Sequence, residues 1–333
     1  MLKSIEIENF RGIKHCKIED LSLVNIFVGK NNSGKSTVLD AIYFGCKEIT
    51  GLALSTILRI RCQREVGGSE IWFGYNPEYY ININLKFEEE KFTVRLRKEG
   101  HTIISSCMHG TDVKDMGRYS FSNVFSGSYT RPVLKIKGTV MNYCEKIKIF
   151  PSLRRVDDLT KDLDELLGRI KLDLEKEDDF RKRISEIYGE TRCEFIPRPE
   201  RRDQKTLVFE QDKYRVFAEF HGDGVKRGAL FISALEVLNN TALLIEEVEN
   251  YQHPEALKKL AKNMVDLARK NNVQLFITTH SYFDALKYFY HSFDPEKRRK
   301  EFRCYTLERE ENGVVNVKIE ENIDNIIRTI YGS

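Results

Sequence analysis

The chain has 333 residues, a length that fits about two domains of ordinary size or one large α/β domain. Hydrophobic residues make up 41% of the chain and charged residues 32%, which provides for a buried core and excludes an intrinsically disordered chain. The 54 basic and 51 acidic residues leave a net charge of +3, so no large field of one sign indicates a nucleic-acid binder.

The first part of the chain is predicted to combine strands with one helix. Alternating apolar residues predict a strand over 2–10, and a continuous apolar run predicts a buried strand over 23–28. Apolar residues three and four positions apart predict a helix over 35–49. Two alternating runs around an acidic turn predict a hairpin over 79–98, whereas the Ser-, Gly- and His-rich stretch 99–130 is interpreted as irregular.

The composition changes at residues 156–190, where leucines lie among alternating acidic and basic residues. This pattern predicts two short helices and no long coiled coil. The elements predicted after them are a hairpin at 205–220, helices at 224–239, 254–270, 281–290 and 321–331, and strands at 242–246, 273–278, 302–308 and 313–319. Buried strands that alternate with helices indicate an α/β fold with a mostly parallel core sheet. The early hairpins indicate an added antiparallel β layer.

One segment matches the pattern GxxxxGK[ST] of phosphate-binding loops, and it follows an apolar strand and opens a helix as such a loop must. Its glycines allow a tight turn whose N–H groups, together with the helix N-terminus, favour phosphate. The Lys35 side chain can reach the outer phosphates and the Ser36 hydroxyl can ligate Mg²⁺. The predicted nucleotide-binding residues are Gly29, Lys30, Asn31, Asn32, Ser33, Gly34, Lys35, Ser36 and Thr37.

Polar residues directly follow two further buried strands. Glu246 and Glu247 come after an apolar run, where two carboxylates are costly unless they meet a cation. We expect Glu246 to hold Mg²⁺, directly or through a water, and Glu247 to polarise an attacking water as a catalytic residue. His280 follows the strand at 273–278, at the same edge of the sheet, where it could bond the outer phosphate or orient the water. A solvated acidic loop and a helix-capping histidine are the structural alternatives.

In this order the three motifs resemble those of the ABC-type ATPase heads of the SMC, RecF and OLD (overcoming lysogenization defect) group. The segments that carry the resemblance are 5–13, 28–36, 222–227, 245–254 and 278–281. The resemblance implies a P-loop NTPase of ABC-head type, with a single head over 1–333 and a helical insertion at about 156–190. It also implies ATP and Mg²⁺ as cofactors and an ATPase activity to which Lys35, Glu247 and His280 contribute.

The group also implies partners. Two heads of this type sandwich two ATP molecules, so the chain is expected to form an ATP-dependent homodimer. By that match Gly222, Asp223 and Gly224 would contact the γ-phosphate of the partner's ATP in trans, and Arg11 would lie near the phosphates or the adenine. The resemblance implies a role in phage defence or DNA transactions, with DNA and a separately encoded effector, such as a nuclease, as candidate partners.

The chain departs from the group's pattern at some positions. Glu246 stands where the group has aspartate, and because the longer side chain shifts the Mg²⁺ shell we expect slow hydrolysis.

The alternative function is a nucleotide-gated binding module with negligible hydrolysis. A GTPase is disfavoured because no NKxD run is present. Gln63 is a weak candidate for the group's glutamine loop, and Arg154 or Arg155 is a candidate for a nucleotide contact.

Other sequence features concern the compartment. No apolar run approaches the roughly 18 residues that a membrane span needs, and the N-terminus lacks the apolar block of a signal peptide. We therefore expect a cytoplasmic protein with no membrane partner. The 7 cysteines form no CxxC pair, so neither a disulfide framework nor a Cys-rich zinc site is predicted.

Overall fold

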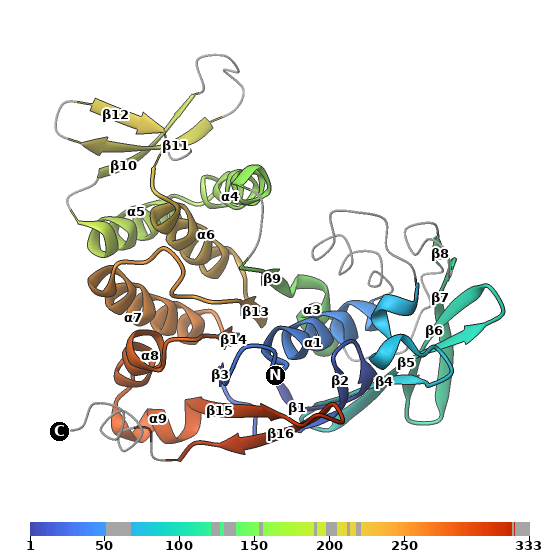
Figure 1. The fold of residues 1–333 in the computed structure, drawn as a ribbon. Coiled ribbons are helices and arrows are strands. Elements are labelled where there is room, and N and C mark those ends of the chain that lie inside the picture. The colour runs from blue at the N-terminus through green and yellow to red at the C-terminus, as the bar shows by residue number, and fades with distance from the viewer. Residues whose placement is uncertain are drawn as a thin grey trace.

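The computed structural model describes residues 1–50, 68–120, 127–129, 138–152, 156–189, 192–197, 205–211, 214–217, 221–321 and 323. These residues form one large sheet, helices that cover it, and a small separate sheet (Figure 1). The 13 strands of the large sheet, in spatial order, are β8 (Gly127–Tyr129), β7 (Asp112–Ser120), β6 (Thr102–His109), β5 (Glu90–Glu99), β4 (Ile81–Phe87), β1 (Leu2–Phe10), β2 (Ile13–Ile18), β16 (Val314–Ile319), β15 (Phe302–Arg309), β3 (Val24–Val28), β14 (Val273–Thr278), β13 (Thr241–Ile245) and β9 (Lys148–Phe150). The small sheet holds β10 (Arg192–Pro197), β11 (Lys205–Gln211) and β12 (Tyr214–Phe217). The helices are α1 (Lys35–Ile49), α3 (Gly138–Lys146), α4 (Val156–Ile170), α5 (Leu174–Tyr188), α6 (Asp223–Val237), α7 (Pro254–Lys270), α8 (Lys287–His291) and α9 (Pro295–Glu301).

Strands β9, β13, β14, β3 and β15 run parallel, side by side. Every residue of β3, β13 and β14 is buried, as expected for strands that are covered on both faces. The buried strands predicted at 23–28, 242–246 and 273–278 are confirmed to within one residue at each end. Because parallel strands share a direction, the loops that follow β3, β13 and β14 all begin at one edge of the sheet.

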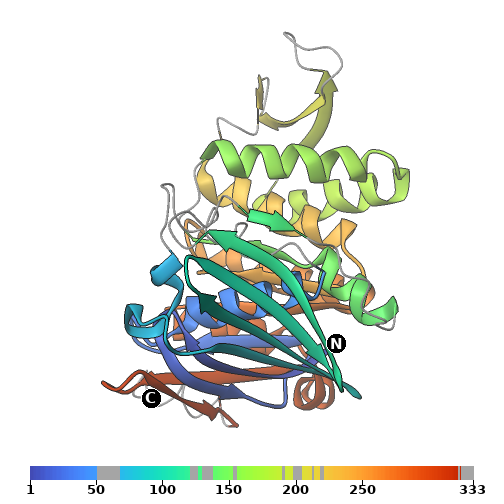
Figure 2. The same cartoon turned by 90° about the vertical axis from the view of Figure 1, so that its right-hand side faces the viewer.

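Strands β1, β2 and β4 to β8 pair antiparallel and continue the same sheet, to which β16 links them through its parallel pairing with β2. A mostly parallel core with an added antiparallel part is therefore confirmed. The antiparallel part lies over α1 (Figures 1 and 2). Helix α1 packs against strands of both parts, so the helix that opens at the phosphate loop is held from two sides.

The two central strands divide the interior into two cores. Phe27 of β3 stacks on Phe276 of β14, with 6.4 Å between the ring centroids, and both rings belong to the core around α1. Their neighbours Ile26 and Ile277 face the opposite side and belong to a second core, which α4 to α8 build. Alternate residues of the same strands thus serve different cores, as the two-residue period of a strand requires.

The interpretation of 99–130 as irregular is wrong, because β6 and β7 form a regular antiparallel pair there, with a register shift between Ser105 and Ser106, and β8 follows. Serines at these two positions concealed the pattern, since both are buried. The Ser105 hydroxyl donates to the carboxylate of Glu48 in α1, which lets a polar residue occupy an interior position. A search for alternating apolar and polar residues therefore misses strands whose inward face contains small polar side chains.

The helical part follows the prediction closely. Helices α4 and α5 confirm the two short helices predicted within 156–190, and both pack on α6. Strands β11 and β12 confirm the hairpin predicted at 205–220, whereas β10, α3, α9 and β2 were not predicted. The helix predicted at 281–290 begins as a π turn and continues as α8. The helix predicted at 321–331 lies outside the described residues except at two positions.

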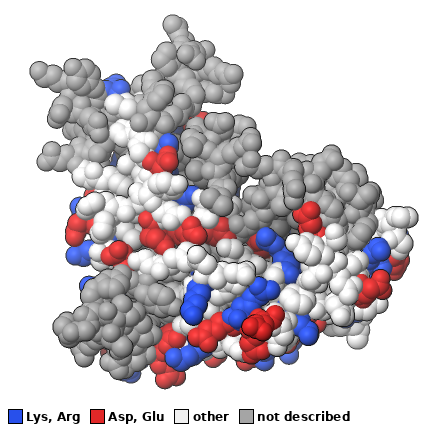
Figure 3. Space-filling model, viewed as in Figure 1, with Lys and Arg blue, Asp and Glu red and all other residues white. Residues whose placement is uncertain are grey.

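The surface is mixed in charge, as the small net charge predicts. Acidic and basic side chains lie interspersed over the face that Figure 3 presents. None of the helices in the described part of the chain is both long enough and apolar enough to cross a membrane.

Candidate nucleotide-binding site

The three predicted motifs meet at the carboxyl edge of the parallel strands. The register pairs Ile245 of β13 with Ile277 of β14, and Thr278 of β14 with Phe27 of β3, so the three strands end at nearly the same level. The hydroxyl of Thr278 accepts the backbone N–H of Glu247 at 3.1 Å. This contact joins the loop after β13 directly to the end of β14.

The phosphate loop between β3 and α1 depends on two glycines with positive φ. At Gly29, φ is 143°, and a Cβ atom would lie 2.4 Å from the carbonyl oxygen of Leu307 in β15. Gly34, with φ of 100°, is the residue before α1, and the helix has no side-chain cap there. The first N–H groups of α1 therefore have no side-chain acceptor, which makes this helix terminus suitable for an anion.

The side chain of Lys35 folds back onto the loop. Its Nζ donates to the carbonyl oxygens of Gly29 and Lys30 at 2.8 and 2.9 Å. Burial lowers the pKa of Lys35, and the nearby carboxylates of Glu247 and Glu249 offset part of that change. The ammonium group of Lys35 therefore lies inside the loop, near the acidic residues that follow β13.

One polar atom of the loop has no partner. The hydroxyl oxygen of Ser33 is buried and makes no hydrogen bond within the described residues. A buried polar group without a partner is uncommon and costly, so this atom fits a loop built for a polar ligand. Together with the uncapped helix and the close fit at Gly29, it makes the loop suitable for the phosphates of a nucleotide.

The two acids after β13 lie in different environments. Glu246 is 1% exposed, and its Oε2 accepts the backbone N–H of Ser152 at 3.0 Å. Glu247 has a positive φ of 48°, and its Oε2 accepts from the amide of Asn250 at 2.6 Å. Its Oε1 lies 3.4 Å from Nε2 of His280, so the structure brings the predicted general base and the predicted histidine together.

A buried arginine also lies beside these acids. Arg227 of α6 is 4% exposed, donates to the carbonyl oxygen of Ser152, and lies 5.5 Å from the ring centroid of Tyr251. Burial lowers its pKa, which Tyr251, Glu247 and Glu246 partly offset. Its place beside the acids that follow β13 depends on contacts between residues far apart in sequence.

Arg11 is placed on the turn between β1 and β2, with a positive φ of 52°. Its guanidinium forms an ion pair with Asp40, which lies in the second turn of α1 and is 1% exposed. Its backbone N–H donates to Ile71 at 2.8 Å. Arg11 therefore ties the first hairpin to the helix that follows the phosphate loop, and its predicted contact with nucleotide remains a prediction.

The predicted signature residues begin α6. Gly222 is the residue before the helix, and Asp223 pairs with Lys226 at 2.7 Å. At Gly224 a Cβ atom would lie 2.2 Å from the carbonyl oxygen of Tyr251, so the helix start touches the loop that carries the acids. No hydrogen bond among the described residues joins 222–224 to 29–37. Gln63, Arg154 and Arg155 lie outside the described residues.

A cavity of about 640 Å³ borders the phosphate loop. Residues Gly29 to Ser33 form one wall, and Thr306 to Glu311, at the end of β15, form the other. Sequence reasoning did not assign the second wall, because nothing in the pattern of β15 distinguishes it from an ordinary strand. This cavity has room for the part of a nucleotide that extends beyond the phosphates.

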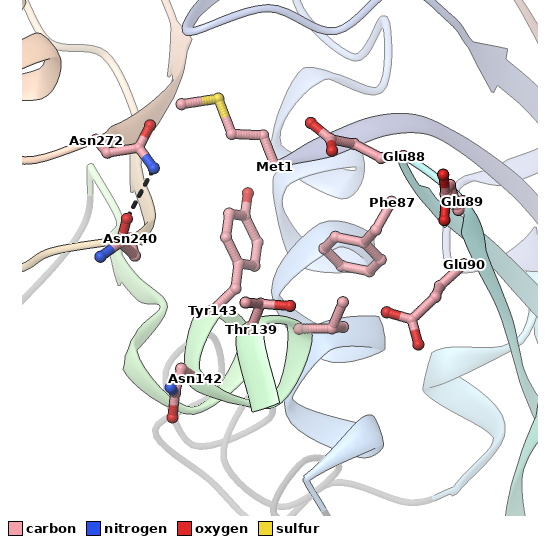
Figure 4. A pocket seen from close by; sticks show the side chains of 11 residues that line it. Met1, Phe87, Glu88, Glu89, Glu90, Thr139, Asn142, Tyr143, Asn240 and Asn272 are labelled. Carbon is pink, nitrogen blue, oxygen red and sulfur yellow. Dashed lines mark hydrogen bonds between the residues drawn. The ribbon is translucent and has the colours of Figure 1, made fainter. Parts of the chain in front are cut away.

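A second cavity, of about 460 Å³, lies at the amino ends of β13 and β14 (Figure 4). Asn240 and Asn272, which precede β13 and β14, line it with Met1, Tyr143 and a run of three glutamates that starts at Glu88. Asn272 donates to Asn240 at 2.8 Å along one side of the cavity. Because it lies at the amino ends of these strands, this cavity is separate from the phosphate loop.

Known proteins resemble this chain in sequence. A family model described as AAA ATPase domain matches residues 1–108 and 135–283. An ATP/GTP phosphatase of Helicobacter pylori is 24% identical over 361 residues, which cover 92% of this chain and 91% of that protein. The DNA double-strand break repair Rad50 ATPase of Archaeoglobus fulgidus is 25% identical over 108 residues, which are 32% of this chain but 10% of that protein.

The fold also has solved counterparts. The structure of an SMC head bound to the C-winged helix domain of ScpA aligns over 98% of this chain and 99% of its own, with a TM-score of 0.63 and 14% sequence identity. At that identity the likeness concerns the fold alone. It agrees with the large mixed sheet and the helices described above.

Proposed function

This chain belongs to the AAA ATPase domain family, as an ATPase of the SMC, Rad50 and RecF type, and from this premise we propose that it binds MgATP at the carboxyl edge of its sheet and hydrolyses it. The observation that carries the proposal is the meeting of Lys35, Glu247 and His280 there. The relative from Helicobacter pylori, which is named an ATP/GTP phosphatase, supports hydrolysis over binding alone.

The roles follow from the geometry. The loop 29–37 would cradle the phosphates with its N–H groups, and Lys35 would exchange its two loop carbonyls for phosphate oxygens. Ser36 and Glu246 would hold Mg²⁺, which when bound neutralises charge on the phosphate oxygens. Glu247 would take a proton from the attacking water, while the His280 ring fixes the position of the Glu247 carboxylate.

The rate of hydrolysis is proposed to be low. Glu246 has a longer side chain than aspartate, and the N–H of Ser152 holds its Oε2. This restraint limits how closely the carboxylate can follow a metal ion between ground state and transition state. A binding module without hydrolysis is less well supported, because Glu247 lies 3.4 Å from the His280 ring, a contact expected of a general base and the residue that orients it.

Self-association belongs to the same proposal. We propose a single head over 1–333, with its helical insertion at about 156–190, that dimerises around two ATP molecules. Residues 222–224 would complete the partner's site, in keeping with their lack of hydrogen bonds to their own phosphate loop. A role in DNA transactions, with DNA as a partner, draws support from relatives named for DNA repair. A role in phage defence, with a separate nuclease as a partner, rests on the sequence resemblance alone.

Phosphate release from ATP tests the proposal. The wild-type protein should release phosphate only when Mg²⁺ is present. Glu247→Gln should lower kcat by about 100-fold or more, because the amide cannot accept the proton of the water. Glu296→Gln, at an exposed position of α9, is the matched control and should behave as wild type. Equal rates for Glu247→Gln and wild type would remove Glu247 as the base.

A further inference from the structure

One more carboxylate belongs to the turn that holds Glu247. The backbone N–H of Asn250 closes this turn on the carbonyl oxygen of Glu247 at 3.0 Å, and Glu249 lies inside it. Oε1 of Glu249 accepts the backbone N–H of His280 at 2.7 Å and that of Ser281 at 3.3 Å. The turn after β13 is thereby bonded to the turn after β14 at the residue that carries the imidazole.

His280 is consequently held at two points by neighbouring acids. Glu249 binds its backbone, and Glu247 lies 3.4 Å from Nε2 of its ring. A hydrogen bond from a backbone N–H to a carboxylate is charge-assisted and stronger than one between neutral groups. The direction of the ring depends on the peptide plane, so the Glu249 contact sets where the imidazole can point.

Two observations indicate that Glu249 serves the site more than the fold. Its second oxygen, Oε2, is shut off from solvent and has no hydrogen-bond partner among the described residues, an arrangement that costs stability. Its first oxygen, Oε1, bonds the backbone of His280, the residue whose ring contacts the proposed general base Glu247.

We propose that Glu249 is a positioning residue, which fixes the peptide of His280 so that the imidazole stays against Glu247. The inference rests on the proposed function, in which Glu247 and His280 act on the attacking water. It assigns Glu249 no contact with substrate. Its effect on hydrolysis passes through His280.

Hydrogen exchange of the nucleotide-free protein tests the contact itself. In Glu249→Ala, the amide of His280 loses its acceptor, whereas that of Ser281 keeps the Thr279 hydroxyl at 2.9 Å. The His280 amide, followed in peptides covering 279–281, should exchange about tenfold faster, the loss expected for one hydrogen bond. Peptides from α1 should be unchanged, and Glu296→Ala should match wild type throughout. Unchanged protection at 279–281 would overturn the inference, whether or not the protein hydrolyses ATP.

Steady-state hydrolysis tests the consequence. Glu249→Ala should lower kcat about tenfold while KM for ATP stays within about twofold, since the phosphate loop is intact. Glu249→Gln should recover most of the rate, because its amide oxygen can still accept from His280.

A double variant separates action through His280 from independent action. In a His280→Ala background, Glu249→Ala should lower the residual rate no further, as expected for two residues that act as one unit. Additive losses, or a Glu249→Gln as slow as Glu249→Ala, would overturn the inference. A wild-type protein that releases no phosphate, with the exchange result as expected, would instead refute the proposed function and leave the Glu249 contact standing.

Discussion

At the scale of single residues, Gly29 shows how narrowly the phosphate loop is determined. Its φ of 143° lies in a region that favours glycine, and a Cβ atom would also lie 2.8 Å from the Ser33 hydroxyl oxygen. The backbone shape and the close packing against β15 therefore demand the same residue. A side chain at this position would displace the loop from the strand beside it.

We expect Gly29→Ala to destabilise the protein by about 1–3 kcal/mol and to abolish measurable binding of a fluorescent ATP analogue, because the strained loop cannot keep its N–H groups convergent. Gly168→Ala is the matched control, since nothing lies within 4 Å of a Cβ there and Gly168 is inside α4. That control should be neutral or slightly stabilising. Wild-type nucleotide affinity in Gly29→Ala would show that the loop tolerates a side chain.

A second prediction at this scale concerns pH. Lys270 of α7 donates to Asp179 of α5 at 3.0 Å, which lowers the pKa of Asp179 and raises that of Lys270. A depressed carboxyl pKa adds stability above the unfolded value, near pH 4, which disappears as the pH falls through the folded value. A raised lysine pKa adds stability below about pH 10 that disappears at higher pH.

Because the side chains of Lys270 and Asp179 are 54% and 39% exposed, Lys270→Met should cost less than about 1 kcal/mol at pH 7, and less still at high salt. At pH 3 the same substitution should cost less than at pH 7, since part of the Asp179 carboxylate is then protonated and the ion pair is weakened. Urea unfolding at the two pH values measures the difference. An equal cost at both would mean that the lysine acts through its apolar stem alone.

At the scale of elements, strands made mostly of apolar residues were predictable, whereas a strand whose interior positions include adjacent serines was not. β3, β13 and β14 are buried on both faces, so no alternation is needed to recognise them. β6 escaped prediction because the serines at 105 and 106 are interior residues. In the site, the phosphate loop and the acids at 246 and 247 were identified because each directly follows a buried strand.

The burial and the neighbours of the site residues depend on tertiary contacts, which the sequence does not show. Arg227 lies one helical turn after Gly224, and its sequence position leaves both a site role and a surface role open. It becomes a buried neighbour of the acids only because Ser152 and Tyr251 meet it from other elements. The wall of the cavity at the end of β15 is likewise defined by its neighbour β3 and not by its own pattern.

The start of α6 gives a test at this scale. Gly224→Ala would place a methyl group 2.2 Å from the Tyr251 carbonyl oxygen, whereas nothing lies within 4 Å of a Cβ at Gly222, where φ is −57°. We expect Gly224→Ala to destabilise the protein by about 1–3 kcal/mol and Gly222→Ala to leave its melting temperature unchanged. Equal melting temperatures for the two variants would show that the helix start is free to shift.

At the scale of the whole molecule, the proposed sandwich predicts a change of mass. Glu247→Gln, which should bind ATP without turning it over, should shift from the 39.0 kDa of one chain to twice that mass in the presence of ATP and Mg²⁺. Light scattering coupled to size exclusion measures this. Lys35→Ala, which removes the ammonium group from the loop, should stay at the mass of one chain. A Glu247→Gln protein that binds ATP yet remains monomeric would refute the dimer.

The division of β3 and β14 between two cores has one more consequence. A single residue added to or deleted from either strand would exchange its two faces, so that side chains sized for one interior would enter the other. The same slip would carry the following loop away from its neighbours. Changes of chain length should therefore be tolerated in the connections at the opposite edge of the sheet, and rejected within these eleven positions.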